Sequence, residues 1–162
     1  MKVYLAGAIE AAPDDGREWR EALTQFLEQD LGYQVHDPSR QEADVMSPKE
    51  HDHFREWRRT DFQRFQKVIH RIIKQDLKQI LFDTDLIICK WDEYVAGGGG
   101  TQGELTLAFL HNIPVYLVSD FPVERISSWI LGCITQKFDN FDDLKVHLKS
   151  VKNSLKPILG KG

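Results

Sequence analysis

The stretch DTDLIICKWDEYVAGGGGTQGELTLAFLHNIPVYLVS, residues 83–119, decides the fold class. It opens with the nearly continuous apolar run DTDLIICKW (83–91), the kind of strand that a parallel sheet buries on both faces. A run of four glycines (97–100) follows, then a predicted helix over 101–111 and a second apolar strand, IPVYLVS (113–119). A strand, a helix and a strand in this order predict two parallel strands joined by a crossover helix.

Strands and helices also alternate on the N-terminal side of this stretch. KVYLA (2–6) is predicted to be a buried strand, and YQVHD (33–37) a second one that ends before Pro38. Between them lies a predicted helix that ends at Gly32, because apolar residues recur there at helical spacing. Those residues are Trp19, Leu23, Phe26, Leu27 and Leu31. Residues 39–47 are polar and without periodicity, and we expect a loop.

The remaining segments continue the pattern. Residues 48–81 are charged and are predicted to form two helices, with one apolar stripe that faces a core. The stripe consists of Ile69, Ile72, Ile73, Leu77 and Ile80. Residues 123–133 are predicted to be helical, 134–138 a short fifth strand and 141–151 a last helix, and the tail after residue 151 is expected to be loosely held.

This alternation predicts an α/β fold in one domain over residues 1–162: a doubly wound parallel sheet of four to five strands with helices on both faces. Ligands of such sheets bind outside the carboxyl ends of the strands, near the point where the strand order reverses. The search for a site is therefore confined to residues 7–10, 36–38, 92–104 and 119–128.

Composition narrows the class of protein. The 162 residues carry 21 basic and 25 acidic side chains, a net charge of −4, and this argues against a nucleic-acid surface. Cys89 and Cys133 lack metal-binding spacing and are predicted to be buried free thiols, which fits a reducing compartment. Neither a signal segment nor a long apolar span is evident, so we expect a cytoplasmic protein without membrane contact. We expect no cofactor and no metal.

The run GGGGTQGE (97–104) carries the strongest chemical signal. Glycines after a strand permit positive φ, and successive amides beside a helix N-terminus can form an anion-binding nest. Glu104 has two readings. Thr101 and Glu104 fit a capping box, in which the carboxylate only satisfies a backbone amide. Alternatively, Glu104 is a nucleophile at the mouth of the sheet, held ionised by the helix dipole.

Four other features of the sequence bear on chemistry. Tyr4 faces either the core or the mouth of the site. Asp76 lies beside the apolar stripe of its predicted helix and either faces solvent or supplies a second carboxylate near Glu104. Asp85 begins its strand at the end away from the site and is predicted to be structural. The His51-Asp52-His53 run lacks a paired i, i+4 ligand and is read as a solvated helix start.

Four segments together resemble nucleoside 2-deoxyribosyltransferases and the related nucleoside 5′-monophosphate N-glycosidases: VYLAGAIE (3–10), DGREWR (15–20), IIKQDLKQILFDTDLII (72–88) and GGGGTQGELTLAF (97–109). The resemblance implies a flavodoxin-like fold and retaining chemistry. It assigns Glu104 as the nucleophile that attacks the sugar C1′, Asp76 as the acid that assists the departing base, and Tyr4 as the residue that orients the nucleophile. Paired carboxylates in different environments suit these roles.

The strand ends and the resemblance also give a substrate-binding set: Gly7, Ala8, Ile9, Asp37, Gly98, Gly100, Thr101, Ser127 and Ser128. The chain departs from the family in several places. Gly98 stands where the transferases carry an Asp. Glu10 stands where the phosphate-accepting relatives carry an Arg, and Arg17 or Arg20 could supply that missing positive charge. The C-terminal aromatic residue of the family is missing, and residues 39–65 find no counterpart.

Three functions follow as hypotheses. The first is deoxyribosyl transfer from a nucleoside to another free nucleobase through a covalent sugar–Glu104 intermediate. The second is hydrolysis of a nucleoside 5′-monophosphate, which an uncharged Gly98 and the serines favour and Glu10 disfavours. The third is a non-catalytic nucleotide-binding domain in which Glu104 is only a cap. A homo-oligomer is expected from the resemblance, with residues 48–81 as one candidate interface.

Overall fold

The computed structural model describes the backbone of residues 1–159 and the side chains of residues 1–40 and 45–152. Its centre is a parallel five-stranded sheet in the order β2-β1-β3-β4-β5. This is the flavodoxin-like strand order, with its switch point between β1 and β3. The predicted fold class is therefore confirmed, with five strands. Their bounds are Lys2–Ala6 (β1), Gln34–His36 (β2), Leu86–Lys90 (β3), Val115–Val118 (β4) and Gln136–Phe138 (β5).

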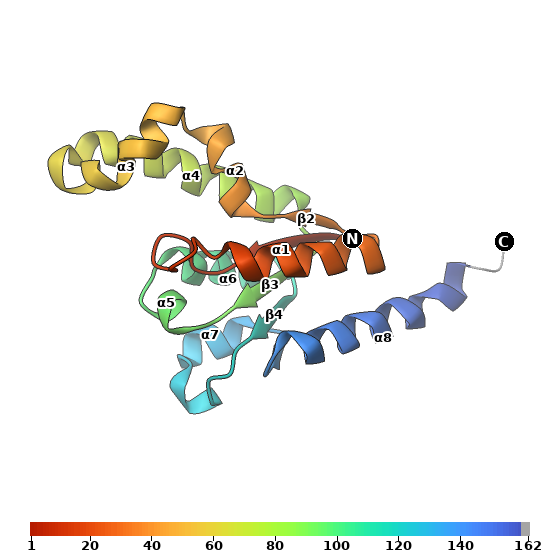
Figure 1. Cartoon of the computed structure of the whole chain (residues 1–162). Helices are drawn as coiled ribbons and strands as arrows, with labels where there is room; N and C mark the ends of the chain where they lie inside the picture. Colours follow the sequence, from red (N-terminus) through yellow and green to blue (C-terminus); the bar gives the residue numbers. More distant parts are fainter. Residues whose placement is uncertain (160–162) are drawn as a thin grey trace.

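Helices cover both faces of the sheet (Figure 1). One face packs against α1 (Arg17–Gln25), its π-helical continuation η1 (Phe26–Asp30) and α8 (Phe141–Leu159). The other packs against α4 (Phe62–Asp83), α6 (Gly100–Leu110) and α7 (Ser128–Cys133), and Tyr4 belongs to that side of the core. Short α5 (Glu93–Ala96) precedes α6, and the 3-10 turn η2 (Val123–Arg125) precedes α7.

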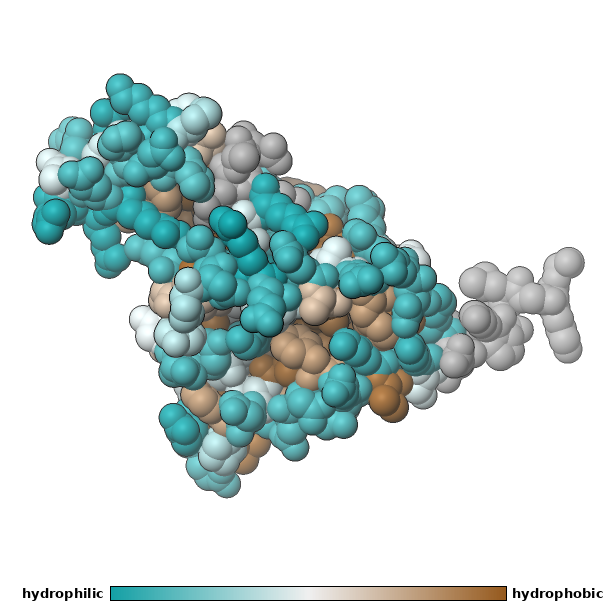
Figure 2. All heavy atoms as spheres, viewed as in Figure 1, coloured by the Kyte–Doolittle hydropathy of each residue, from teal (hydrophilic) through white to brown (hydrophobic). Residues whose placement is uncertain are grey.

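A helical arm, residues 38–72, stands off from the sheet in the upper left of Figure 1. It consists of α2 (Pro38–Val45), α3 (Pro48–Thr60) and the first half of α4, which enclose a separate small core of Met46, Phe54, Trp57 and Val68. A capping box between Ser47 and Glu50 starts α3. The outer surface of the arm is mostly hydrophilic (Figure 2).

The arm corrects two predictions. Residues 39–47 are not a loop, because Pro38 starts α2 and the Asp37 carboxylate accepts a hydrogen bond from the Ser39 amide. The two helices expected over 48–81 are confirmed, but the apolar stripe does not face one core. Ile72 packs in the arm and Ile80 in the sheet core, and Ile73 between them is 47% exposed.

The C-terminal half differs from the prediction in two further ways. The helix expected over 123–133 is interrupted, since Ser127 caps α7 and separates it from the 3-10 turn η2. The last helix extends to Leu159, beyond its predicted end at residue 151; residues 160–162 of the tail lie outside the described residues. Both cysteines are buried and free, as predicted. Within the described residues, the helices are all too short or too polar to cross a membrane.

Candidate functional site

Tyr4 and Glu104 meet on the α4/α6 face of the sheet. Tyr4 lies in β1, is fully buried, and its hydroxyl donates a hydrogen bond of 2.8 Å to Glu104 Oε1. Glu104 comes from the second turn of α6, one hundred residues later in the chain. The predicted pairing of a strand tyrosine with this carboxylate is thus present in the geometry.

The environment of Glu104 differs from the one predicted. Burial raises the pKa of the Glu104 carboxyl, while the Tyr4 hydrogen bond and the positive charge of Arg20 act in the opposite direction. The helix dipole does not hold Glu104 ionised as expected, because α6 starts at Gly100 and Glu104 lies past its first turn. The capping-box reading is also wrong, since Gly99 is the N-cap and makes no side-chain cap.

Asp76 lies within electrostatic range of Tyr4. It is partly buried on α4, which packs beside α6. Burial, then the negative charges of Glu104 and Asp76, raise the pKa of Tyr4 well above its usual value. Tyr4 therefore stays a protonated donor, and Asp76 lies close enough to act on it electrostatically. Asp76 is thus placed near Tyr4, and its role as a second carboxylate beside Glu104 stays a prediction.

The glycine run does not form the predicted nest. None of residues 97–100 has positive φ, and the Gly98 amide donates to the Val95 carbonyl at 3.0 Å. The reason is Asp92, whose carboxylate accepts from the amides of residues 94 and 95 and starts α5. The first glycines then complete the turn after α5, and Gly100 and Thr101 open α6.

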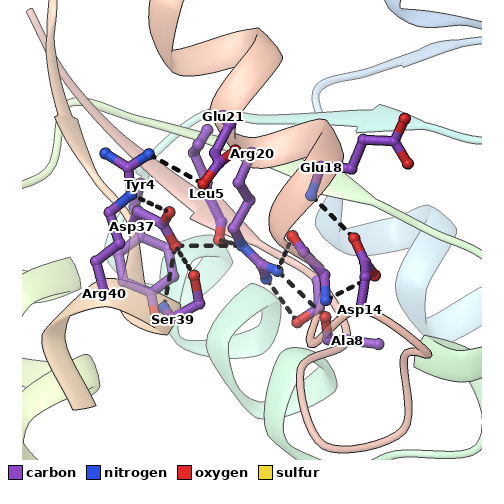
Figure 3. Close-up of polar contacts among 12 residues, drawn as sticks. Tyr4, Leu5, Ala8, Asp14, Glu18, Arg20, Glu21, Asp37, Ser39 and Arg40 are labelled. Atoms are coloured by element: carbon purple, nitrogen blue, oxygen red, sulfur yellow. Dashed lines mark hydrogen bonds and ion pairs between the residues drawn. The ribbon is translucent and has the colours of Figure 1, made fainter. Parts of the chain in front are cut away.

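Arg20 organises the loop after β1, and sequence reasoning had considered it only as a spare cation. Its side chain is completely buried and donates to four backbone carbonyls (Figure 3). They belong to Leu5 (3.3 Å), Gly7 (2.9 Å), Ala8 (3.2 Å) and Gly16 (2.9 Å). The one sequence signal is an arginine at helical spacing with Leu23 of α1 and Leu27 of its continuation η1, which both pack in the core.

Asp37 completes this network, and its predicted substrate-binding role stays a prediction. Its buried carboxylate lies 3.5 Å from Arg20 Nε and 3.5 Å from Arg40 Nε, and it accepts from the amide and the hydroxyl of Ser39 (Figure 3). These internal partners account for the buried charge. Asp37 is placed to join the end of β2 to the loop after β1.

Ser127 and Ser128 lie on the exposed start of α7. The Ser127 hydroxyl accepts from the Trp129 amide at 3.3 Å and thereby caps the helix. Within the described part of the chain, neither serine is brought into contact with Tyr4 or Glu104. The predicted phosphate-binding role of these serines gains no support from their position.

The helical arm meets the loop after β1. Arg55 Nη2 lies 3.1 Å from Asp15 and Arg58 Nη1 lies 3.4 Å from Glu10. The Glu10 charge is thus paired by Arg58 and not by Arg17 or Arg20, a partner that could not be foreseen while residues 39–65 had no assigned place. A cavity of about 270 Å³ lies between arm and loop, with Ile9 among its lining residues. Among the described residues, no three acidic, His or Cys side chains gather as metal ligands.

Comparisons with known proteins agree with the geometry at the level of the fold. A solved 2-deoxyribosyltransferase from the psychrotolerant bacterium Bacillus psychrosaccharolyticus superposes with a TM-score of 0.58 at 20% identity, over 90% of each chain. A conserved protein from Enterococcus faecalis V583 superposes with a TM-score of 0.57 at 17% identity, over 93% of this chain and 98% of that one. No protein-family model and no curated protein matches the sequence. The shared fold is thus that of a 2-deoxyribosyltransferase.

Proposed function

We propose that the protein is a nucleoside 2-deoxyribosyltransferase, with residues 1–162 as one domain of that kind. The observation that carries the proposal is the 2.8 Å hydrogen bond from buried Tyr4 to Glu104, with Asp76 acting on the same hydroxyl. Tyr4 of β1 bonds Glu104 of α6, and Asp76 of α4 acts on the same tyrosine. Folds of this class bind their ligands at the carboxyl edge of the sheet, the edge from which α6 starts. The shared fold with a 2-deoxyribosyltransferase supports the same function.

In the first half-reaction, a carboxylate oxygen of Glu104 attacks C1′ of the sugar and a C1′–O ester bond forms. The C1′–N bond breaks at the same time, and its electron pair leaves with the base. Asp76 supplies the proton that the departing base takes up, because an anionic base is a poor leaving group. The transition state resembles an oxocarbenium ion, which a close carboxylate stabilises and then traps.

In the second half-reaction, a nitrogen of another free nucleobase attacks C1′. The ester bond breaks, its electron pair returns to Glu104, and the proton released by the incoming base goes back to Asp76. Tyr4 donates its hydrogen bond to Glu104 throughout and fixes the direction of the attacking oxygen. Burial strengthens the nucleophile but raises its pKa, and the Tyr4 hydrogen bond offsets part of this rise.

The non-catalytic hypothesis loses its physical basis, since Glu104 makes no cap and is turned toward Tyr4. Hydrolysis of a nucleoside 5′-monophosphate is the second candidate. Arg17 and Arg55 line the cavity beside Ile9 and are the cations there for a phosphate, although Asp15 pairs with both and Asp52 also lines the cavity. Against it, the Gly98 amide is already bonded and is not free to bind phosphate.

One chromatographic assay separates the candidates. The protein is incubated with deoxynucleosides and with their 5′-monophosphates, each with and without a free acceptor base, beside Glu104→Ala. New nucleoside that appears only with the acceptor establishes the transferase. Free base released from monophosphates without an acceptor moves the assignment to the hydrolase. No turnover of any pair contradicts both enzymatic proposals.

A further inference from the structure

The loop after β1 has its carbonyl groups turned inward. The carbonyls of Gly7 and Ala8 both accept hydrogen bonds from Arg20, at 2.9 and 3.2 Å. In a trans peptide, a carbonyl and the following N–H point in opposite directions. The amides of Ala8 and Ile9 therefore point away from Arg20, and neither has a hydrogen-bond partner among the described residues.

The loop after β1 has contacts on both faces of the sheet. Arg20 approaches from α1, on one face, whereas the Ala8 side chain packs against the cluster that contains Tyr4. Two adjacent unpaired N–H groups thus lie after the carboxyl end of β1 and point away from Arg20, at the edge of the sheet where such folds bind ligands. Such groups bind a hydroxyl or phosphate oxygen, and they hold it firmly only if the peptide planes are fixed.

We propose that Arg20 is a positioning residue of the reaction above, which fixes the peptide planes of residues 7–9 so that their amides bind an oxygen of the sugar. The inference rests on the proposed function. Arg20 is completely buried, and it reaches four carbonyls and the Asp37 carboxylate, so its position is determined from several sides. It also acts on the nucleophile, because its charge lowers the pKa of Glu104.

Two glycines keep the space that this arrangement needs. A Cβ on Gly16 would collide with Arg20 Nη1 and with the Ala8 carbonyl, and Gly16 has a φ of 67°. A Cβ on Gly7 would lie 2.9 Å from the Trp19 ring and 3.3 Å from Arg20 Nη2. The two glycines and the arginine therefore form one unit, in the segments GAIE and DGREWR.

The test compares Arg20→Lys, Arg20→Gln and the control Arg40→Gln. Arg40 also pairs with Asp37, but it is exposed and donates to none of the loop carbonyls. Lysine keeps the charge and cannot span four carbonyls, so Arg20→Lys is expected to raise KM about tenfold. Arg20→Gln is expected to raise KM similarly and to move the acid limb of kcat/KM to higher pH. The control Arg40→Gln is expected to keep the wild-type KM and the wild-type acid limb of kcat/KM.

A purely structural arginine would give a different result. Both Arg20 variants would then melt at lower temperature while the folded enzyme kept the wild-type KM and acid limb, and that outcome overturns the proposal. A second measurement needs no Arg20 variant. In the Glu104→Gln protein, the amide resonances of Ala8 and Ile9 are expected to shift on addition of 2′-deoxyadenosine, and unchanged resonances in the presence of bound nucleoside contradict the inference.

These readouts also separate the two proposals. Wild-type protein that binds 2′-deoxyadenosine with shifts at Ala8 and Ile9 but never turns a nucleoside over would contradict the proposed function and support only the binding role of the two amides. Normal turnover with wild-type KM and limb in both Arg20 variants would leave the function standing and refute the positioning role.

Discussion

Replacement of Tyr4 by Phe tests how the nucleophile is tuned. The change removes one hydroxyl from a fully buried ring and with it the 2.8 Å hydrogen bond to Glu104 Oε1. A hydrogen bond to a charged group contributes about 1.5–3 kcal/mol, and one pKa unit corresponds to about 1.36 kcal/mol. Because this bond lowers the pKa of Glu104, its loss is expected to raise that pKa.

The assay is the pH dependence of kcat/KM, whose acid limb reports the ionisation of Glu104 in the free enzyme. The acid limb of Tyr4→Phe is expected to lie at higher pH than that of the wild type. Tyr116→Phe is the matched control, since Tyr116 lies in β4 and its hydroxyl pairs with His147 on the other face of the sheet. An unchanged acid limb in Tyr4→Phe, with kcat also unchanged, would refute the reasoning.

Three further substitutions give distinct results. Glu104→Gln is expected to abolish turnover. In urea unfolding, this variant should also be more stable than the wild type at about pH 8 but not at about pH 4. The reason is that the raised native pKa of Glu104 makes its ionisation cost stability as the pH rises through that pKa. Equal stability of the two proteins at both pH values would contradict the buried charge. Asp76→Asn should lose about 10²-fold or more in kcat with its circular dichroism kept, and an unaffected rate would make Asp76 structural. Gly16→Ala should lower the free energy of unfolding by about 1–3 kcal/mol, since it adds a collision with Arg20 to a residue at positive φ; wild-type stability would show that the loop rearranges freely.

The strands, their parallel arrangement and most helices were predictable from local pattern, whereas the flavodoxin-like strand order followed only from the resemblance. Residues 83–91 are apolar almost throughout because β3 lies in the middle of the sheet, between β1 and β4. Period-3.6 spacing likewise predicted α1 and its continuation η1, whose Leu23 and Leu27 are buried. The pairing of Tyr4 with Glu104 was reached through the resemblance, since no local signal joins residues one hundred positions apart.

The wrong predictions have two causes: contacts made by residues distant in the sequence, and helix caps that the sequence pattern did not indicate. α2 was missed because its start depends on Asp37 and Pro38 and not on periodicity. The glycine run was misjudged because Asp92 starts a helix before it. Arg20 was read as a loose cation, although its four carbonyl partners come from two separate parts of the loop and from the end of β1.

The measurement that tests the central claim most directly is the mass of the intact protein after rapid mixing with a slowly reacting deoxynucleoside. The proposed reaction predicts an increase of one deoxyribosyl unit, on the peptide that carries Glu104, which disappears when an acceptor base is added and never forms in Glu104→Gln. Turnover without any adduct, or an adduct on a different residue, would contradict Glu104 as the nucleophile.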